Sequence, residues 1–488
     1  MKVFSRNLAL LLPGLLIVLL VSHCNHQTTS QPVVKAPVDP VVAKIGEYVI
    51  TKGELEKKLL TELYPNQYNY FNEETEPADA KSVLLQMIAE KAMIIEARKQ
   101  GRLEDETVNA PIKKYRDRRL ASLLVQNHLK EMKDKITATE SEIEQRMQAD
   151  PNANRTRVKA MLESTKARII VFQYYNQLCK KFHIKKLSEN FTQAIQIHQR
   201  LLNHPKTPQK IKFIRNYQIK DEMTPEEKNI VLATHDYGKV TLEDWFNALC
   251  EPSPPNRPKN LNTPKGIEQL LDRALSIPMY VFEAKLQNLD KDENFLKQVR
   301  EYEDTRLLSK AKSDIYKQVT EPTNEQIVDY FNNNKEAFRT GRFLNIDQIW
   351  CEDLKTAKQV KAELDSGKDF ESVKQEHSLA KKSKAFKRYP SNEGLFWKDL
   401  WQAEPNDIIG PIKGFYGQQI KWRIVKILKK ETGEIKEYSD KMTNSIKNGI
   451  MSKQRTTLIA EYGHELLKKY PYKIYTKRIE NIDPLNIQ

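Results

Sequence analysis

The sequence has little glycine and no glycine-rich loop for binding phosphate. Only 15 of its 488 residues are glycine, and no GxGxxG or Walker-type pattern occurs. Glycine in a helix interior costs about 1 kcal/mol relative to alanine, so a low glycine content suits long helices. These absences argue against a nucleotide enzyme that holds phosphate in such a loop, and they favour a helix-rich protein.

Cysteine is scarce as well, at four residues. There is no CxxC pair and no cysteine and histidine spacing of the kind that binds zinc, so we expect no metal site and no cofactor. Cys179, Cys250 and Cys351 lie far apart in the sequence. They are compatible with one disulfide and a free thiol or with three isolated buried thiols, and the sequence leaves this open.

One long apolar run is present, at 8–21, and it is short for a membrane span. It follows basic residues, as in an export signal, and it ends at Cys24 in a pattern that resembles a bacterial lipobox, although His23 stands where glycine or alanine is usual. We expect a lipoprotein signal peptide at 1–24, lipid attachment at Cys24 and a polar tether at 25–40. Ordinary signal cleavage and an uncleaved anchor helix are the alternatives.

The net charge of +15 is spread along the chain. A basic protein could bind nucleic acid, but an export signal separates it from nucleic acid, and we expect no such partner. Acidic client segments or anionic lipid headgroups suit this charge better, and a plain solvated surface is the simplest explanation.

An internal repeat is the most informative feature of the chain. Residues 41–51 and 231–241 share valine, alanine and threonine at matching places, and both stretches end in a threonine that begins a capping box. Further on, about nine of roughly 25 positions match at one constant offset, which indicates two related modules. The matching residues are Glu96, Ala97, Gln100, Asp105, Glu106, Tyr115, Asp117, Arg119 and Leu120 in the first copy, and Glu283, Ala284, Gln287, Asp292, Glu293, Tyr302, Asp304, Arg306 and Leu307 in the second.

A returning helix is predicted after each copy. It follows the first copy directly, at about 155–182, but in the second copy it comes only at the end of the chain, after an insert. We expect each module to consist of a hairpin, several helices and its own returning helix. The predicted parts are a first helical module at 41–186, a basic connector at 187–228, the outgoing part of a second helical module at 229–340, the insert at 341–430, and a returning helix with a tail at 431–488.

The insert has the pattern of a small α+β domain. Residues 342–350 alternate like a strand, 357–364 have helical spacing, and 417–428 read as closing strands. The predicted fold class is therefore mostly α, with an α+β insert that contains a small antiparallel sheet.

Several motifs of the insert resemble those of parvulin-type peptidyl-prolyl isomerases. They are the spacing Ala357-x6-Leu364-x2-Gly367-x2-Phe370, the segment Glu393-Gly394-Leu395-Phe396-Trp397, and the segment Asp407-Ile408-Ile409-Gly410-Pro411. The helical modules around the insert are similar to the chaperone domain of the exported SurA-like and PrsA-like foldases. The resemblance covers most of residues 41–477.

The resemblance implies a proline pocket with a floor of paired histidines, but both histidine positions are glutamine here. The first-strand position falls at Gln348 and the closing-strand position at Gln419, where an insertion near Lys421 leaves the alignment open. Glutamine forms hydrogen bonds but does not titrate. The other expected pocket positions are Leu395 and Trp397.

The segment after Trp397 is also too short for the helix that grips proline in this family. We therefore expect an enzyme with weak isomerase activity or no enzyme at all, because an apolar pocket is needed to desolvate the prolyl amide. Cys351, His377 and Tyr389 could form a replacement site, although Cys351 also reads as a core residue and His377 as a surface residue.

Two groups of aromatic residues are candidates for holding unfolded polypeptide. Aromatic residues packed as local core are the alternative interpretation. The candidates are Tyr64, Tyr68, Tyr70 and Phe71 in the first module, and Trp245 and Phe246 in the second.

The sequence thus predicts a lipid-anchored protein of the bacterial cell envelope, facing the periplasm or the cell exterior. It would act as a SurA/PrsA-type chaperone or foldase whose partners are unfolded or nascent exported polypeptides. The alternatives are a working peptidyl-prolyl isomerase and a structural envelope lipoprotein with one fixed protein partner.

Overall fold

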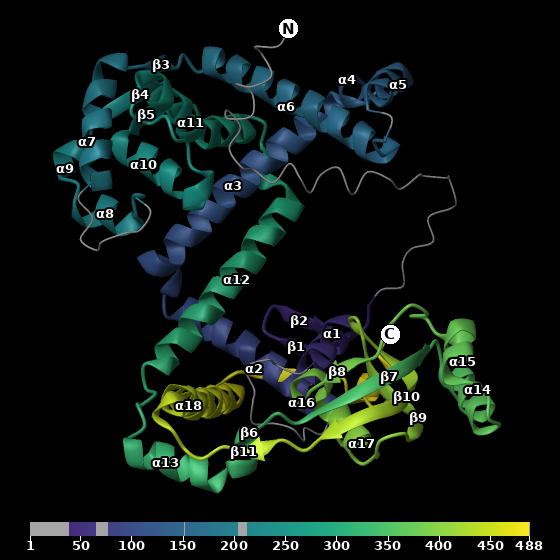
Figure 1. Ribbon diagram of the computed structural model, residues 1–488. Coiled ribbons are helices and arrows are strands. Elements are labelled where there is room, and N and C mark those ends of the chain that lie inside the picture. The colour runs from purple at the N-terminus through teal and green to yellow at the C-terminus, as the bar shows by residue number, and fades with distance from the viewer. Residues whose placement is uncertain (1–38, 65–76, 151, 204–211, 488) are drawn as a thin grey trace. The chain divides into compact units, whose positions relative to one another are not determined.

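The computed structural model describes residues 39–64, 77–150, 152–203 and 212–487. These residues form two compact units, the first made of 106–303 and the second of 39–105 together with 304–487. The described residues are mostly helical, with small antiparallel sheets, as Figure 1 shows, so the predicted fold class is confirmed.

The first unit packs helices around one three-stranded sheet in the order β3-β4-β5. Its helix α11 contacts α3, α6, α7 and α10. The elements are α3 (Glu106–Glu131), α4 (Lys133–Ile136), α5 (Glu140–Ala149), α6 (Arg155–Lys181), β3 (Lys185–Lys186), η4 (Ser188–Asn190), α7 (Phe191–Asn203), α8 (Asn216–Asp221), α9 (Pro225–Lys228), β4 (Val231–His235), β5 (Gly238–Thr241), α10 (Leu242–Cys250), η5 (Pro254–Asn256), α11 (Pro264–Leu286), η6 (Leu289–Lys291) and the beginning of α12 (Glu293–Tyr316).

The second unit contains a three-stranded sheet in the order β12-β1-β2 and a four-stranded sheet in the order β8-β7-β10-β9. The end of α12 belongs to this unit. Its other elements are β1 (Val41–Ile45), β2 (Tyr48–Thr51), α1 (Lys52–Leu63), α2 (Ala80–Lys99), η3 (Arg102–Glu104), α13 (Asn324–Asn333), η7 (Lys335–Phe338), β6 (Arg339–Thr340), β7 (Phe343–Cys351), α14 (Leu354–Asp365), α15 (Phe370–His377), β8 (Phe386–Arg388), α16 (Pro390–Glu393), η8 (Gly394–Phe396), α17 (Trp397–Trp401), β9 (Ile408–Tyr416), β10 (Gln419–Glu431), β11 (Glu434–Ile435), α18 (Asp440–Lys469), β12 (Tyr472–Ile474), η9 (Thr476–Arg478) and η10 (Pro484–Asn486).

Both short hairpins lead into a capped helix, as the sequence predicted. Thr51 accepts a hydrogen bond from the backbone of Glu54, whose side chain bonds back to the threonine backbone, and Thr241 and Asp244 form the same capping box. Such a box satisfies backbone N–H groups that have no partner within the helix. The local sequence therefore fixes where α1 and α10 begin.

The returning helices pack differently from the expectation. Strand β3, which follows α6 of the first sequence copy, pairs with β4 of the second copy, and β12, at the end of the chain, pairs with β1 of the first copy. Likewise α6 contacts α11, and α18 contacts α2. The expectation that each hairpin packs with its own returning helix is wrong for the described residues. The predicted modules at 41–186 and at 229–340 with 431–488 are therefore not separate folded units. Each compact unit combines parts of both modules.

The segment 187–228, expected to be a connector, belongs to the first unit. In its described part, α7 is strongly amphipathic and buries Phe191, Ala194, Ile197 and Leu201 in the same cluster as α10 and α11. Sequence composition indicated a basic and proline-containing stretch, but the apolar side chains at helical spacing determine how it packs.

The four-stranded sheet of the insert has two covered faces. All its strand pairs are antiparallel. One face packs against α14 and α15, which lie beside the sheet in Figure 1, around Ile349, Val360 and Ile424. The other face packs against α17, around Trp397 and Val425. Because strand side chains alternate between faces, β7 and β10 contribute to both.

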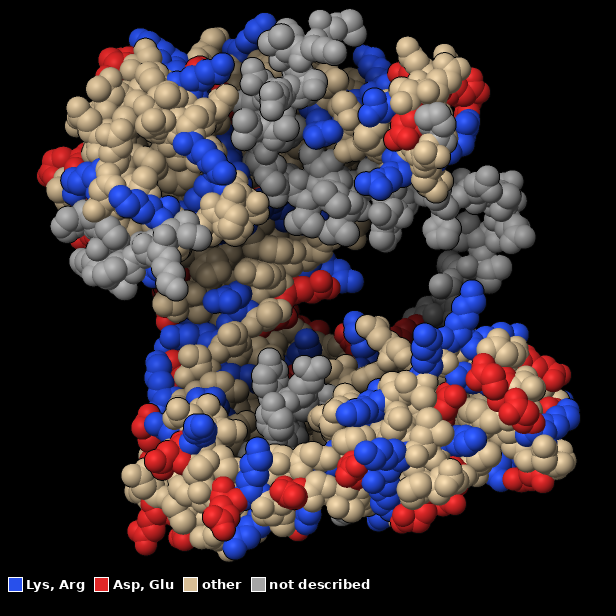
Figure 2. Space-filling view, in the orientation of Figure 1, with Lys and Arg blue, Asp and Glu red and all other residues tan. Residues whose placement is uncertain are grey.

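The predicted signal peptide at 1–24, the lipid site Cys24 and most of the tether at 25–40 lie outside the described residues. Among the helices that are described, none is long and apolar enough to cross a membrane. On the visible face of each unit, Lys and Arg are interspersed with Asp and Glu, as Figure 2 shows. The view thus shows mixed charge rather than one basic patch.

A buried carboxylate anchors each returning helix. Glu96 on α2 accepts hydrogen bonds from the Lys469 Nζ at 2.6 Å and the Tyr470 hydroxyl at 2.7 Å. In the first unit, Lys181 at the end of α6 donates to Glu283 on α11 at 2.5 Å. The bonds from Lys469 and Tyr470 lower the pKa of the Glu96 carboxyl from 4.5 to about 2.

We predict that Glu96→Gln destabilises the second unit by about 1–2 kcal/mol at pH 7, because it removes a charge-assisted hydrogen bond. The folded-state pKa is depressed, so the stabilisation by Glu96 is present above pH 4.5 and is lost as the pH falls towards 2. Urea unfolding at pH 7 and pH 2.5 would measure this, with the exposed Glu480→Gln as control. An equal cost of Glu96→Gln at both pH values would contradict the prediction.

Candidate functional site

The candidate site lies on the sheet face that α17 covers. Along β7 and β10 this face begins with aliphatic side chains, among them Leu344, Ile346, Val425 and Ile427, which contact Trp397. The next positions on the same face are polar. Gln348 lies opposite Val425 in the strand register, and Arg423 is two residues before Val425. The alternation of strand side chains therefore brings Gln348 and Arg423 together.

A fully buried arginine occupies the centre of this face. Arg423 is 0% exposed, as is Glu393, and Gln348 is 5% exposed. The Arg423 guanidinium donates to the Gln348 Oε1 at 3.1 Å and to the Glu393 Oε2 at 2.6 Å. The other carboxylate oxygen of Glu393 accepts a hydrogen bond from Arg388. These four side chains form one polar network, which is buried except at Arg388.

Two neighbours fix the position of the buried guanidinium. It lies over the Trp350 ring, 5.1 Å from the ring centroid, which is the distance of a cation–π contact. Gly414 on β9 lies beside it, and a Cβ atom at this position would overlap the guanidinium. The glycine therefore leaves the space that Arg423 fills.

The network holds Glu393 in its charged form. Burial alone would raise the pKa of the Glu393 carboxyl, but the Arg423 and Arg388 guanidinium groups lower it below its usual value. An ionised carboxylate paired to two arginines carries no proton to donate and is a weak proton acceptor, and the arginine does not deprotonate in proteins. The site can therefore form hydrogen bonds but has no group suited to exchange protons near neutral pH.

The structure brings some of the expected pocket residues together and separates one from them. Gln348 and Trp397 are both buried on this face, and Leu395 is half-buried in η8. Gln419 is exposed at the first position of β10, opposite Tyr416, so it does not meet Gln348. The closing-strand residue that bonds to Gln348 is Arg423, which corrects the alignment that placed Gln419 there.

Arg423 and Glu393 are the site residues that sequence reasoning missed. The hairpin of β9 and β10 is long, and this length places Arg423 rather than Gln419 beside Gln348. A signal was present, because Arg423 has the same strand parity as the buried residues Val425 and Ile427. Glu393 is the first residue of the motif at 393–397, but the sequence indicated no partner for its side chain and so no role.

The helix expected to be shortened is short. Helix α17 covers only Trp397–Trp401, and β9 begins at Ile408. Its two tryptophans stack on each other with ring centroids 5.2 Å apart, and the Arg342 guanidinium lies over both rings. The aromatic side chains of α17 thus pack among themselves and against the sheet.

Tyr64 contacts the insert. Its ring stacks on Phe415 near the tip of the β9–β10 hairpin, with centroids 4.6 Å apart, and its hydroxyl donates to the Gly417 carbonyl oxygen at 3.0 Å. Phe415 also meets Phe396 edge-on at 5.0 Å. Tyr64 therefore joins the end of α1 to the insert. The other candidates of this group, Tyr68, Tyr70 and Phe71, lie outside the described residues.

Trp245 and Phe246 belong to the core of the first unit, which corrects their proposed role in client binding. Both are 0% exposed, and the Trp245 indole donates to the Ile267 carbonyl oxygen at 3.0 Å. A side chain without exposed surface cannot hold a client unless the fold opens. The alternative that they pack as local core is the one the structure supports.

A cavity of about 670 Å³ opens in the first unit between α3, α11 and the β4–β5 hairpin. The Tyr237 and Phe282 rings stack at 4.9 Å on its wall, and Tyr237 is 52% exposed. Its polar lining includes Asp117 of α3 and Arg273 of α11. Sequence reasoning missed this cavity, because its residues come from four separate segments.

Cys351, His377 and Tyr389 have different neighbours and form no shared site. Cys351 is fully buried beside α14, and burial raises the pKa of its thiol to about 11. Tyr389 is exposed, and its ring is near Phe343. All three cysteines of the described residues are free, so none of them forms a disulfide.

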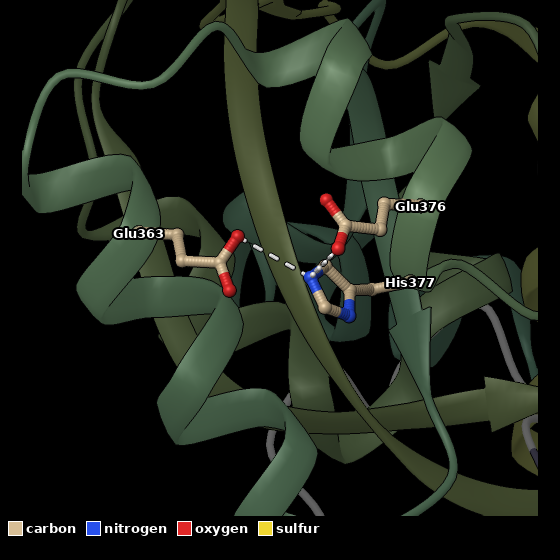
Figure 3. A group of neighbouring side chains, drawn as sticks. All are labelled: Glu363, Glu376 and His377. Atoms are coloured by element: carbon tan, nitrogen blue, oxygen red, sulfur yellow. Dashed lines mark hydrogen bonds and ion pairs between the residues drawn. The ribbon is translucent and has the colours of Figure 1, made fainter.

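His377 lies in a small cluster with two glutamates, shown in Figure 3. Its Nε2 is 3.2 Å from the nearer Glu363 oxygen and 3.7 Å from Glu376, and the three ligand atoms lie within 4.8 Å of one another. This spacing is close enough for a shared cation. Lys368 already pairs with Glu363 at 3.1 Å, however, and supplies a positive charge to the cluster.

No family model matches the chain, and no curated protein does. Among solved structures the chain resembles, at low identity, SurA-like chaperones and PrsA foldases. One of them is a Campylobacter jejuni structure, described under PEB4 and the periplasmic protein Cj1289 as two structurally related SurA-like chaperones. It is 16% identical to this chain, the match covers 55% of this chain and 98% of that one, and the TM-score is 0.24.

Two PrsA structures are similar in the same degree. The PrsA foldase of Streptococcus pneumoniae is 18% identical, covers 41% of this chain and 77% of its own, and has a TM-score of 0.23. PrsA of Bacillus subtilis is 17% identical, covers 41% and 80%, and has a TM-score of 0.16. At these values the likeness carries no functional argument.

We predict that Glu393→Gln destabilises the second unit by about 3–5 kcal/mol, because it leaves the Arg423 charge buried without a carboxylate. Urea unfolding followed by tryptophan fluorescence would measure this. Glu376→Gln, on the exposed face of α15, is the control and should change stability by less than about 0.5 kcal/mol. A Glu393→Gln variant as stable as the control would show that the buried pair is not formed.

Proposed function

We propose that this chain is an exported, membrane-tethered chaperone of the SurA/PrsA type that holds unfolded polypeptide by non-covalent contacts. The observation that carries this proposal is the cavity of the first unit. It combines an exposed aromatic wall, Tyr237 on Phe282, with half-buried charged groups from two helices. A concave site of mixed polarity suits extended segments of varied sequence.

The parvulin-like insert contributes little or no isomerase activity in this proposal. Rotation about an X-Pro bond has a barrier of about 20 kcal/mol, and an enzyme lowers it with an apolar pocket and suitable hydrogen bonds. Here the buried ion pair of Arg423 and Glu393 fills the sheet face beside Gln348, and α17 is short. These features support a binding or structural role for the insert.

Attachment to the membrane through Cys24 is part of the same proposal. Its support is the sequence alone: a basic start, an apolar run and a cysteine at its end. The partners are then unfolded exported polypeptides at the surface of a bacterial membrane, and no nucleic acid is involved.

We expect the chain without its signal peptide to suppress aggregation of an unfolded exported protein at about equimolar ratio. On the same sample, it should not accelerate cis/trans exchange in a panel of short X-Pro peptides. Light scattering and a protease-coupled exchange assay would measure the two activities. Exchange that is accelerated by the wild type and not by Gln348→Ala would instead make this protein a working isomerase. Absence of suppression would contradict the chaperone proposal.

A further inference from the structure

One aspartate occupies matching positions in the two units, and its hydrogen-bond partners differ between them. In the second unit, Asp304 on α12 accepts hydrogen bonds from the Tyr48 hydroxyl at 2.9 Å and from the Arg98 guanidinium at 2.7 Å. The side chains of Arg98 and Asp304 are 16% and 12% exposed, so this pair is largely buried. A phenol and a guanidinium therefore satisfy the Asp304 carboxylate in the second unit.

Asp117 on α3 is the corresponding residue of the first unit. It lies as many residues after the start of α3 at Glu106 as Asp304 lies after the start of α12 at Glu293. Both helices follow a short 3-10 turn that comes after a long helix, α2 in one case and α11 in the other. Asp117 and Asp304 therefore occupy the same position in two matching helices.

Both partners of the carboxylate are missing in the first unit. Tyr48 pairs with Ile45 at the end of its hairpin, and at the same hairpin position in the first unit Gly238 pairs with His235. Arg98 is the second-last residue of α2, and Lys285 is the second-last residue of α11. The phenol is thus replaced by glycine, and the guanidinium by a shorter ammonium group.

Asp117 consequently forms no hydrogen bond or ion pair within the described residues of its unit, although it is half-buried. Burial raises the pKa of its carboxyl, and Lys113, Lys285 and Arg116 oppose this shift from a longer range. A half-buried carboxylate without a hydrogen-bond donor is unfavourable, and a ligand that brings such a donor relieves the cost.

The cavity of the first unit lies where these partners are missing. Asp117 and Gly238 line it, together with Tyr237, Phe282 and Pro278. Tyr237 also meets Phe182 edge-on at 5.5 Å, so its ring is held although half of it is exposed. The carboxylate and the aromatic wall therefore face the same space.

The lining of the cavity also includes an arginine and a neutralised acid. Arg273 of α11 has an Nε that donates to no acceptor in the described residues. Glu251 is paired with Lys114 at 3.1 Å and also with Arg118. Asp117 is thus a carboxylate of the lining that no cation holds directly.

We propose that this cavity binds an extended client segment in which an arginine lies beside an aromatic residue, with the arginine on Asp117 and the aromatic ring on Tyr237. The occupant supplies to Asp117 the guanidinium that Arg98 supplies to Asp304 in the second unit. This inference rests on the proposed function, because it names the kind of segment that the chaperone holds. Charge-assisted hydrogen bonds to a half-buried carboxylate are stronger than neutral ones, so arginine is selected over an uncharged side chain.

The test uses the chain without its signal peptide and two peptides labelled at the N-terminus, fluorescein-Ser-Tyr-Arg-Ser-Tyr-Ser-amide and the same peptide with citrulline for arginine. Citrulline keeps the shape of the side chain and removes its charge. Fluorescence anisotropy should show the arginine peptide binding on the order of tenfold more tightly. Asp117→Asn should abolish this preference, and the exposed Glu144→Gln should keep it.

A second variant separates the charge from the ring. Tyr237→Ala should weaken both peptides alike and leave the arginine preference in place. Asp117→Asn removes a half-buried charge and keeps the side-chain shape, so its unfolding midpoint should not fall below that of the wild type. Equal affinity for the two peptides, a preference that survives Asp117→Asn, or no binding of either peptide would overturn the inference.

Aggregation suppression, measured on the same samples, distinguishes the two levels of the proposal. If the wild type suppresses aggregation but shows no arginine preference, this inference fails and the chaperone function stands. If the wild type neither suppresses aggregation nor binds either peptide, both fail.

Discussion

The pairing of β12 with β1 and of β3 with β4 is the constraint on which the rest of the structure depends. Each hairpin has only two short strands, and such a hairpin is marginally stable by itself in water. A third strand, which follows a returning helix, completes each sheet, and Glu96 and Glu283 anchor the ends of those helices through Lys469 and Lys181. Since the third strand of each sheet comes from the other sequence copy, neither half of the chain can form a complete unit alone.

The two similar arrangements differ in the partners of one carboxylate. In the second unit, Tyr48 and Arg98 donate hydrogen bonds to Asp304. The insert contacts the rest of this unit through Tyr64, which donates to the Gly417 carbonyl oxygen, and through Lys413, which donates to the Leu485 carbonyl oxygen at 2.9 Å. In the first unit the matching carboxylate is left without a donor, and a cavity opens beside it. The proposal places client binding in the first unit.

Buried charge sets the chemistry of the insert. A guanidinium without solvent exposure is costly unless it is paired, and Arg423 is paired through its two terminal nitrogens with Gln348 and Glu393. The same bonds hold Glu393 in its ionised form, so the face has no group that exchanges protons near neutral pH. The sheet face is therefore suited to stability, and this agrees with the small catalytic role proposed for the insert.

Local signals in the sequence predicted the parts of the fold that depend on neighbouring residues. The capping boxes at Thr51 and Thr241 and the helix later seen as Arg155–Lys181 are such cases, because caps and periodicity act over a few residues. The small antiparallel sheet of the insert was predicted from strand alternation in the same way.

Features that depend on distant segments could not be predicted. The strand register that brings Arg423 to Gln348 is set by the long β9–β10 hairpin, and a small shift in register changes which residue faces the site. Trp245 reads as a surface aromatic until α11 covers it. The exchange of returning strands has no local signature, because either hairpin offers the same edge to either strand.

Crosslinking across the β1–β12 pair is the most direct test of the exchange. Lys44 and Lys473 are exposed register partners, and facing residues of antiparallel strands are close enough for a disulfide. With Cys179, Cys250 and Cys351 replaced by serine and without the signal peptide, Lys44→Cys with Lys473→Cys should oxidise to a disulfide within one molecule. Mass spectrometry of the digested monomer would detect it. Failure to form this bond, or its formation only between two molecules, would contradict the exchanged arrangement.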